Sequence, residues 1–204
     1  GFAVKFGLKK NSDFIDLVLF SAKDDEHSLD SFCSINPMQN LVININASKL
    51  IYEKIVLNAE FSTSGLTKDS NSPENKDAAP IIFKAADFIL RNKTSTVYKN
   101  AFKSSVTYNA DIYSAGIAYE KIDPEYTTLG AYYFNNDFEN LTVTASAKFL
   151  ENKLNFNLNS GIQRNNLENE KLSGMRRIVS SVNSNFSPSP KWTLSLNYSN
   201  FNSY

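Results

Sequence analysis

The sequence is poor in the residues on which most catalytic, metal and disulfide chemistry depends. It has one cysteine, Cys33, and one histidine, His27, among 204 residues. An internal disulfide is therefore excluded, and a Ser-His-Asp or Cys-His scheme would have to use His27, which no nucleophile motif accompanies. The seven glycines form no phosphate-binding loop. We therefore expect no enzymatic activity, no cofactor and no resident metal.

Neither sign of charge is in excess, and no long apolar run is present. Lysine plus arginine and aspartate plus glutamate each number 21, whereas a nucleic-acid-binding protein normally carries a basic surplus. We therefore expect no nucleic-acid partner. No segment approaches the roughly 20 apolar residues of a transmembrane helix, which excludes helical membrane proteins. The lack of a long apolar run does not exclude a transmembrane β-barrel, because only alternate residues of its strands contact lipid.

The chain does have strict alternation of apolar and polar residues in segments of strand length. In residues 141–149, Leu, Val, Ala, Ala and Phe fall on one face and Thr, Thr, Ser and Lys on the other. The segment from Phe14 to Ala22 is apolar on both faces. Ten strands are predicted, at approximately 2–9, 14–22, 41–48, 51–62, 98–108, 112–121, 139–149, 153–163, 175–186 and 191–201.

The connections between these segments alternate between short and long. The short ones are Lys10–Asp13, Lys49–Leu50, Asn109–Asp111, Leu150–Asn152 and Ser187–Pro190. The long ones are Lys23–Asn40, Thr63–Val97, Lys121–Phe138 and Arg164–Gly174. Transmembrane barrels place short turns in the periplasm and long loops outside. The alternation of short and long connections predicts an all-β antiparallel meander that forms a transmembrane barrel or a segment of a larger one. The alternative is a soluble all-β barrel or sandwich, whose apolar face would point into a core.

In the membrane interpretation, the parity of each strand assigns its side chains to lipid or to the lumen. The side chains expected to face lipid are Phe6, Leu57, Val143, Phe156 and Leu194. Those expected to face a hydrated lumen are Lys148, Asn155, Asn157, Arg177 and Asn197. Arg176 shares the parity of the apolar face and would lie near the outer rim, where a long cation can reach the head groups.

The loop parity also bears on the two ends of the chain. With the short turns in the periplasm, residues 1 and 204 both lie at the outer rim, where a whole bacterial barrel would not normally place its ends. We therefore expect a single domain over residues 1–204 that is part of a larger barrel. Its outermost strands, Phe2–Lys9 and Lys191–Phe201, are expected to pair with strands outside these residues, because unpaired edges are costly in lipid.

Two of the long loops carry further patterns. In the 63–97 loop, the first half is polar, and residues 80–91 form an apolar stretch that is either a short helix beginning at Pro80 or another strand. Helical spacing would place Ile82, Ala86 and Ile89 together. The acidic loop Asp24–Asp30 includes His27 and could hold Ca²⁺ through its carboxylates, or be a solvated loop rich in turn formers.

The stretch 122–138 is aromatic and lies on the long-loop side of the sheet. Its candidate contact residues are Tyr126, Tyr132, Tyr133 and Phe134. They could fold inward as a constriction or form a lip that contacts a ligand. Alternatively, they could form an aromatic girdle at the membrane interface.

The residues from Tyr119 to Asp137, followed by alternating strands and the segment Gly161–Leu167, resemble large outer-membrane β-barrel proteins of Bacteroidota. The resemblance covers the last half of the chain and identifies no site residues. It implies a location in the bacterial outer membrane and a role in a transport or secretion assembly. We accordingly expect a barrel with a polar lumen, in contact with outer-membrane lipid and with other outer-membrane or surface proteins. The alternative function is a cell-surface binding module that uses its long aromatic loops.

Overall fold

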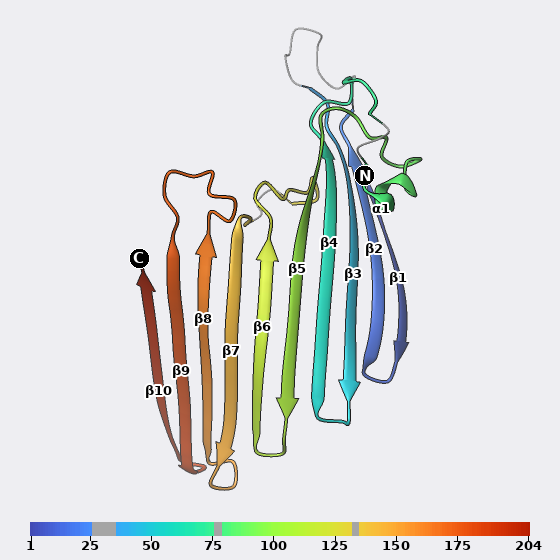
Figure 1. Cartoon of the computed structure of the whole chain (residues 1–204). Helices are drawn as coiled ribbons and strands as arrows, with labels where there is room; N and C mark the ends of the chain where they lie inside the picture. The colour runs from blue at the N-terminus through green and yellow to red at the C-terminus, as the bar shows by residue number, and fades with distance from the viewer. Residues whose placement is uncertain (26–35, 76–78, 132–134) are drawn as a thin grey trace.

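The computed structural model describes residues 1–25, 36–75, 79–131 and 135–204. The chain forms one antiparallel sheet of ten strands in which each strand pairs with the next along the sequence (Figure 1). The strands are β1 (Phe2–Lys10), β2 (Asp13–Lys23), β3 (Gln39–Ile51), β4 (Ile55–Thr67), β5 (Thr96–Asn109), β6 (Tyr113–Ile122), β7 (Phe138–Phe149), β8 (Leu154–Asn165), β9 (Arg176–Ser189) and β10 (Trp192–Ser203). The predicted all-β meander of ten strands is confirmed. Within the described residues, β1 and β10 are the two edges and do not pair with each other.

Two of the predicted turns are wrong. Lys49 and Leu50 lie within β3, and the hairpin turn is at residues 52–54. The Asp13 carboxylate explains the extra length, because it accepts hydrogen bonds of 2.7 Å from the Lys49 ammonium and 2.7 Å from the Leu50 backbone N–H. Likewise, residues 187–189 belong to β9 and not to a turn.

The strand register defines two chemically different faces. Opposed residues in neighbouring strands share a face, so each face can be followed through the ladders. The face that we call the apolar face carries Phe6, Leu17, Ile45, Phe61 and Phe102, which lie in one row. The other, the polar face, carries the row Asp16, Asn46, Glu60, Lys103 and Glu120.

Most of the apolar face is not covered by protein. The exposed large apolar side chains of β5 to β7 all lie on it: Phe102, Val106, Tyr108, Tyr113, Ile117, Leu141, Val143 and Phe149. Val143 is 46% exposed and Leu194 is 70% exposed. The described residues contain no second sheet that could cover this face. A sandwich core, in which these side chains would be buried, is therefore absent from the described part of the chain.

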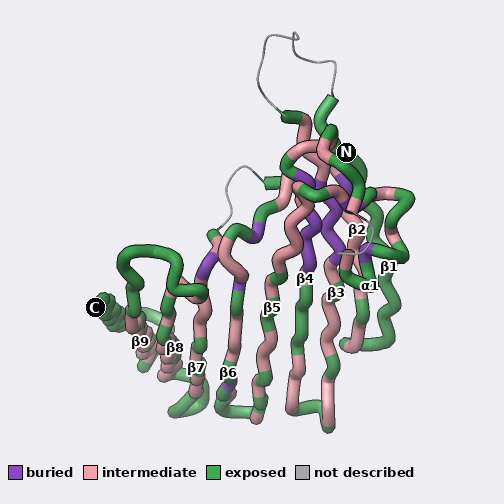
Figure 2. The backbone as a smooth tube through the Cα atoms, turned by 45° about the horizontal axis from the view of Figure 1, so that its top comes forward, coloured by how far each residue is buried: buried purple, intermediate pink, exposed green. Residues whose placement is uncertain are grey.

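Buried residues gather instead at the long-loop end of the sheet (Figure 2). There α1 (Ile81–Lys84) and the turns that follow it lie on the apolar face, where Phe83 and Leu90 pack with Leu41 and Ile43. The segment is thus one helical turn and not a strand. Its inward residues are Phe83 and Leu90, each 1% exposed, rather than Ile82. In the part of the chain that the structure describes, no helix has the length and hydrophobicity to cross a membrane.

Gly65 on β4 explains why the helical segment can approach so closely. A Cβ atom at this position would lie 2.8 Å from a Leu90 methyl carbon and 2.9 Å from the Phe83 ring. Contacts of that length do not occur between carbon atoms, so a side chain here would push the segment away. The small residue therefore makes room for the core cluster.

The register also shifts steadily along the strand direction. Lys9, beside the β1–β2 turn, lies in the same row as Phe201, close to the far end of β10. The row between them passes through Phe14, Ser48, Asn58, Ser105, Ala118, Thr142, Gly161 and Val179. Consequently the short turns step downward from β1–β2 to β7–β8 (Figure 1). With a rise of about 3.4 Å per residue and about 4.8 Å between strands, the strands are tilted by roughly 30–35° from the normal to the line of turns.

Candidate functional site

The connection between β6 and β7 folds onto the polar face of the sheet. Tyr126, at its centre, is 3% exposed, and its hydroxyl lies 2.7 Å from the hydroxyl of Ser62. Ser62 is on the polar face of β4, opposite Asn44. Burial raises the pKa of the Tyr126 phenol, so this side chain is neutral at physiological pH. The loop therefore lies across the polar face of the sheet.

A second set of hydrogen bonds fastens the same loop to β3 and β4. The fully buried Asn40 side chain accepts a hydrogen bond of 3.1 Å from the Leu129 backbone N–H. Its amide group donates to the Ser64 hydroxyl at 2.9 Å and to the Gly65 carbonyl at 3.0 Å. The Ser64 hydroxyl in turn donates to the Thr127 carbonyl at 2.6 Å. Every polar atom of the Asn40 amide thus has a partner, as burial demands.

The same loop accounts for the apolar residues on the second face of β2. A Cβ on Gly130 would lie 3.0 Å from the Phe20 ring, so the loop backbone is in contact with that ring. Phe20 lies on the polar face of β2, directly opposite Val42 on β3. Two apolar faces on β2 therefore reflect cover on both sides: the helical segment on one and the β6–β7 loop on the other.

Below Tyr126, the polar face has a niche of about 230 Å³. Its charged wall is formed by Glu60, Lys103 and Glu120, which oppose one another on β4, β5 and β6. The Lys103 ammonium lies 4.0 Å from Glu120, and Asn44 donates to Glu60 at 2.8 Å. These charges and hydrogen-bonding groups suit water, hydrated ions and small polar solutes, and Ala101, Ile122 and Tyr126 form the apolar part of the lining.

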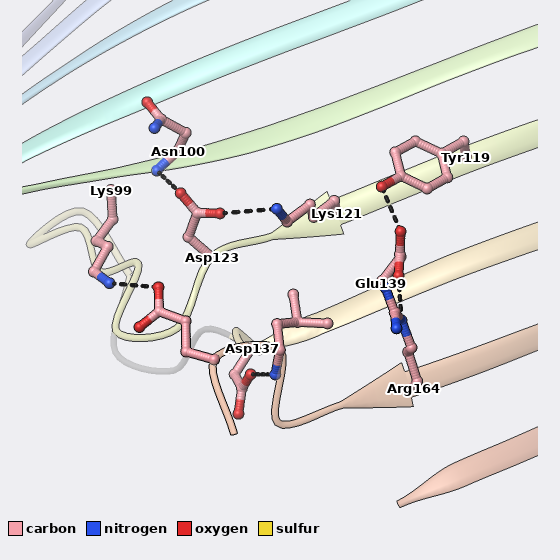
Figure 3. A network of polar contacts seen from close by, with 10 residues as sticks. Lys99, Asn100, Tyr119, Lys121, Asp123, Asp137, Glu139 and Arg164 are labelled. Atoms are coloured by element: carbon pink, nitrogen blue, oxygen red, sulfur yellow. Dashed lines mark hydrogen bonds and ion pairs between the residues drawn. The ribbon is translucent and has the colours of Figure 1, made fainter. Parts of the chain in front are cut away.

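Outside the niche, polar contacts tie the long loops to one another and to the strand ends (Figure 3). Asp123 accepts a hydrogen bond of 2.9 Å from the Asn100 backbone N–H, and its carboxylate is 3.9 Å from Lys121. The Lys99 ammonium lies 3.2 Å from Glu168 in the β8–β9 loop. Asp123 thus ties the start of the β6–β7 loop to β5, and Lys99 ties β5 to the β8–β9 loop.

Asp137 is a buried carboxylate that connects two of the long loops. It is 4% exposed, accepts a hydrogen bond of 2.8 Å from the Leu167 backbone N–H and forms an ion pair with Lys171. Burial raises the pKa of the carboxyl, but the bond from Lys171 and the backbone donors outweigh burial, so the pKa lies below its ordinary value of 3.8. Asp137 is therefore ionised at neutral pH and joins the β6–β7 loop to the β8–β9 loop.

The register places the predicted site residues on two faces. The five residues expected to face lipid, Phe6, Leu57, Val143, Phe156 and Leu194, all lie on the apolar face. The five expected to face the lumen, Lys148, Asn155, Asn157, Arg177 and Asn197, all lie on the polar face. The surroundings assigned to each face remain predictions.

The loop candidates have different outcomes. Tyr126 is buried against Ser62, which leaves its ring little surface for an external partner. Tyr132, Tyr133 and Phe134 lie outside the described residues.

The acidic loop is described only in part. Glu26, His27 and Asp30 lie outside the described residues, while the Asp24 carboxylate accepts a hydrogen bond of 2.9 Å from the Met38 backbone N–H. Among the described residues, no three His, Cys, Asp or Glu side chains gather into a metal-binding cluster. The Ca²⁺ interpretation of this loop therefore remains untested.

The sequence did not single out Asn40, Ser62 or Ser64, although they fasten the loop to the sheet. Each follows the ordinary polar parity of its strand, so alternation gives no sign of a partner far away in the chain. An asparagine at the start of an otherwise apolar run, as in Asn40-Leu41-Val42, was the only available hint.

Comparison with known proteins finds no matching family model, curated protein or solved structure. The resemblance to outer-membrane barrels of Bacteroidota therefore remains a prediction from the sequence.

Proposed function

We propose that this chain forms part of the wall of a β-barrel in the bacterial outer membrane and serves as a structural or transport component with a polar lumen. The observation that carries the proposal is the apolar face, which continues through all ten strands and stays exposed over most of its extent. A soluble monomer rarely exposes an apolar surface of such extent. An exposed apolar face of this extent needs an apolar environment such as lipid hydrocarbon. Closed barrels are the β-structures that can span such an environment.

The stagger of the strands supports a barrel over a flat sheet. Closing a sheet into a barrel requires tilted strands and a regular shift in register. The tilt of roughly 30–35° obtained from the row between Lys9 and Phe201 is close to the 35–45° typical of membrane barrels. The antiparallel order of the strands places the short turns at one end of the sheet and the long loops at the other.

The loop on the polar face gives the proposed lumen a specific character. Tyr126 and its neighbours would narrow the lumen beside β3 and β4, and the niche with Glu60, Lys103 and Glu120 would lie below that narrowing. A barrel wall of this kind passes or holds small polar solutes and contributes no covalent chemistry. Transport is therefore the favoured role, and a structural role follows if further segments fill the lumen.

The proposal is tested by placing a charge on either face of one strand. Val143→Arg puts a cation on the apolar face of β7. Thr144→Arg puts the same cation at the next residue of the strand, on the polar face. A cation at the middle of the lipid-facing surface costs about 2–4 kcal/mol, whereas a lumen position tolerates it.

The measurement uses the complete barrel to which this sheet belongs, assembled into liposomes, and compares its gel mobility with and without heating. We expect the unmodified protein and Thr144→Arg to give a heat-sensitive, folded band, and Val143→Arg to give much less of it. Equal assembly of both variants, or a protein that stays folded and soluble without detergent, would contradict the membrane assignment.

A further inference from the structure

A row of charged residues ends the apolar face on its long-loop side. Lys121 on β6 opposes Glu139 on β7, Glu139 opposes Arg164 on β8, and Arg164 opposes Arg176 on β9. The row thus has three cations and one carboxylate. Like charges directly opposite each other destabilise a sheet, and an anion between the two arginines would remove their repulsion.

The one carboxylate of the row is already engaged. Glu139 accepts a hydrogen bond of 2.6 Å from the Tyr119 hydroxyl and forms an ion pair with Arg164 (Figure 3). The Arg164 side chain is nevertheless 64% exposed. Within the described residues, no carboxylate lies within ion-pair distance of Arg176, whose guanidinium is 5.9 Å from the centre of the Tyr204 ring. Both arginines therefore keep hydrogen-bond donors for an external anion.

A groove runs from these arginines onto the apolar surface. It has a volume of about 590 Å³, and the residues beneath the charges are Leu141 and Ile162. These two side chains oppose each other on β7 and β8 and are 47% and 40% exposed. The groove therefore has a cationic end and an apolar floor, and both lie on the same face of the sheet.

We infer that this groove binds a membrane lipid with a phosphate head group, the phosphate lying between Arg164 and Arg176 and an acyl chain lying over Leu141 and Ile162. The inference rests on the proposed function, because only a membrane-embedded sheet presents this face to lipid. Guanidinium groups match the geometry of phosphate oxygens with paired N–H donors. A phosphate between them would also reduce the repulsion of the two opposed arginines.

The test uses the protein assembled in a zwitterionic detergent and measures retained lipid by native mass spectrometry. Phosphatidic acid is compared with diacylglycerol of the same acyl chains, which lacks the phosphate. We expect the unmodified protein to retain phosphatidic acid about tenfold better, the effect of one charge-assisted hydrogen bond. The double variant Arg164→Gln, Arg176→Gln should lose this preference.

The matched control is Arg177→Gln, which removes a cation from the next residue on the opposite face of β9. This variant should keep the preference for phosphatidic acid. Equal retention of both lipids by the unmodified protein, or an equal loss in Arg177→Gln, would overturn the inference. Displacement of the lipid by millimolar inorganic phosphate would also overturn it, because the site would then select phosphate without the chain. The heat-sensitive band reports separately on barrel assembly, so a folded protein without lipid preference refutes this site alone.

Discussion

The side-chain oxygen of Asn40 on β3 accepts a hydrogen bond of 3.1 Å from the backbone N–H of Leu129, 89 residues later in the chain. Asn40 is fully buried at this contact. The bond joins the start of β3, at the long-loop end of the sheet, to the loop between β6 and β7. It shows that the loop is part of the packed structure on the polar face.

Replacing Asn40 by alanine should release this loop. The Leu129 N–H and the Ser64 hydroxyl would each lose a partner, and unsatisfied buried groups of this kind cost about 1–3 kcal/mol. We expect a corresponding loss in the free energy of unfolding and faster protease cleavage within residues 123–131. Asn157→Ala, at an exposed position on the same face, is the control. Equal protease resistance of both variants would show that Asn40 does not hold the loop.

Acidification should separate the β6–β7 and β8–β9 loops through Asp137. Because the pKa of Asp137 is lower in the folded protein than its ordinary value of 3.8, its contribution to stability is present above that value and is lost as pH falls through the folded pKa. Urea unfolding should therefore show a stability loss below about pH 4. Asp137→Asn should reduce stability by about 1–3 kcal/mol at neutral pH and flatten this acid limb. An unchanged acid limb in the variant would contradict the assignment.

A side chain at Gly65 should displace the helical segment from the apolar face. Gly65→Ala brings a methyl group to within 2.8 Å of the Leu90 side chain, and overpacking of this kind costs about 1–3 kcal/mol. Gly174→Ala is the control, because its nearest contact is an ordinary 3.7 Å. We expect a lower midpoint of thermal unfolding for the first variant only. The same midpoint for both would show that the segment does not pack as described.

Reversing the charge of Lys103 should change ion selectivity if the polar face lines a conducting lumen. Lys103→Glu would place three carboxylates side by side on β4, β5 and β6, which attracts cations into the narrowed region. Lys121→Glu is the matched control, because it makes the same charge change on the apolar face of β6. In planar bilayers under a salt gradient, we expect a cation-selective shift in reversal potential for Lys103→Glu alone. Equal shifts would argue against a lumen on the polar face.

Strand number, order and face were readable from the sequence because a strand exposes alternate residues to opposite sides. The two faces of β7 and β8 follow directly from the alternation in residues 141–149 and 154–159. An antiparallel pair can be joined by a short turn, which explains the pairing at the five short connections, and the strands joined by long loops pair in chain order as well. The end of β3 was not readable in the same way, because the Asp13 contacts that extend this strand come from β2.

Tertiary structure alone decided what lies against the sheet. Residues 80–91 have apolar positions compatible with a helix or a strand, and Gly65 with the Leu41 cluster selects one helical turn with Phe83 inward. The position of Tyr126 depended on Ser62 and Asn40, which are distant in sequence and unremarkable within their strands. Alternation is a local property and is written in each segment, whereas the cover on each face results from contacts between segments that no local pattern encodes.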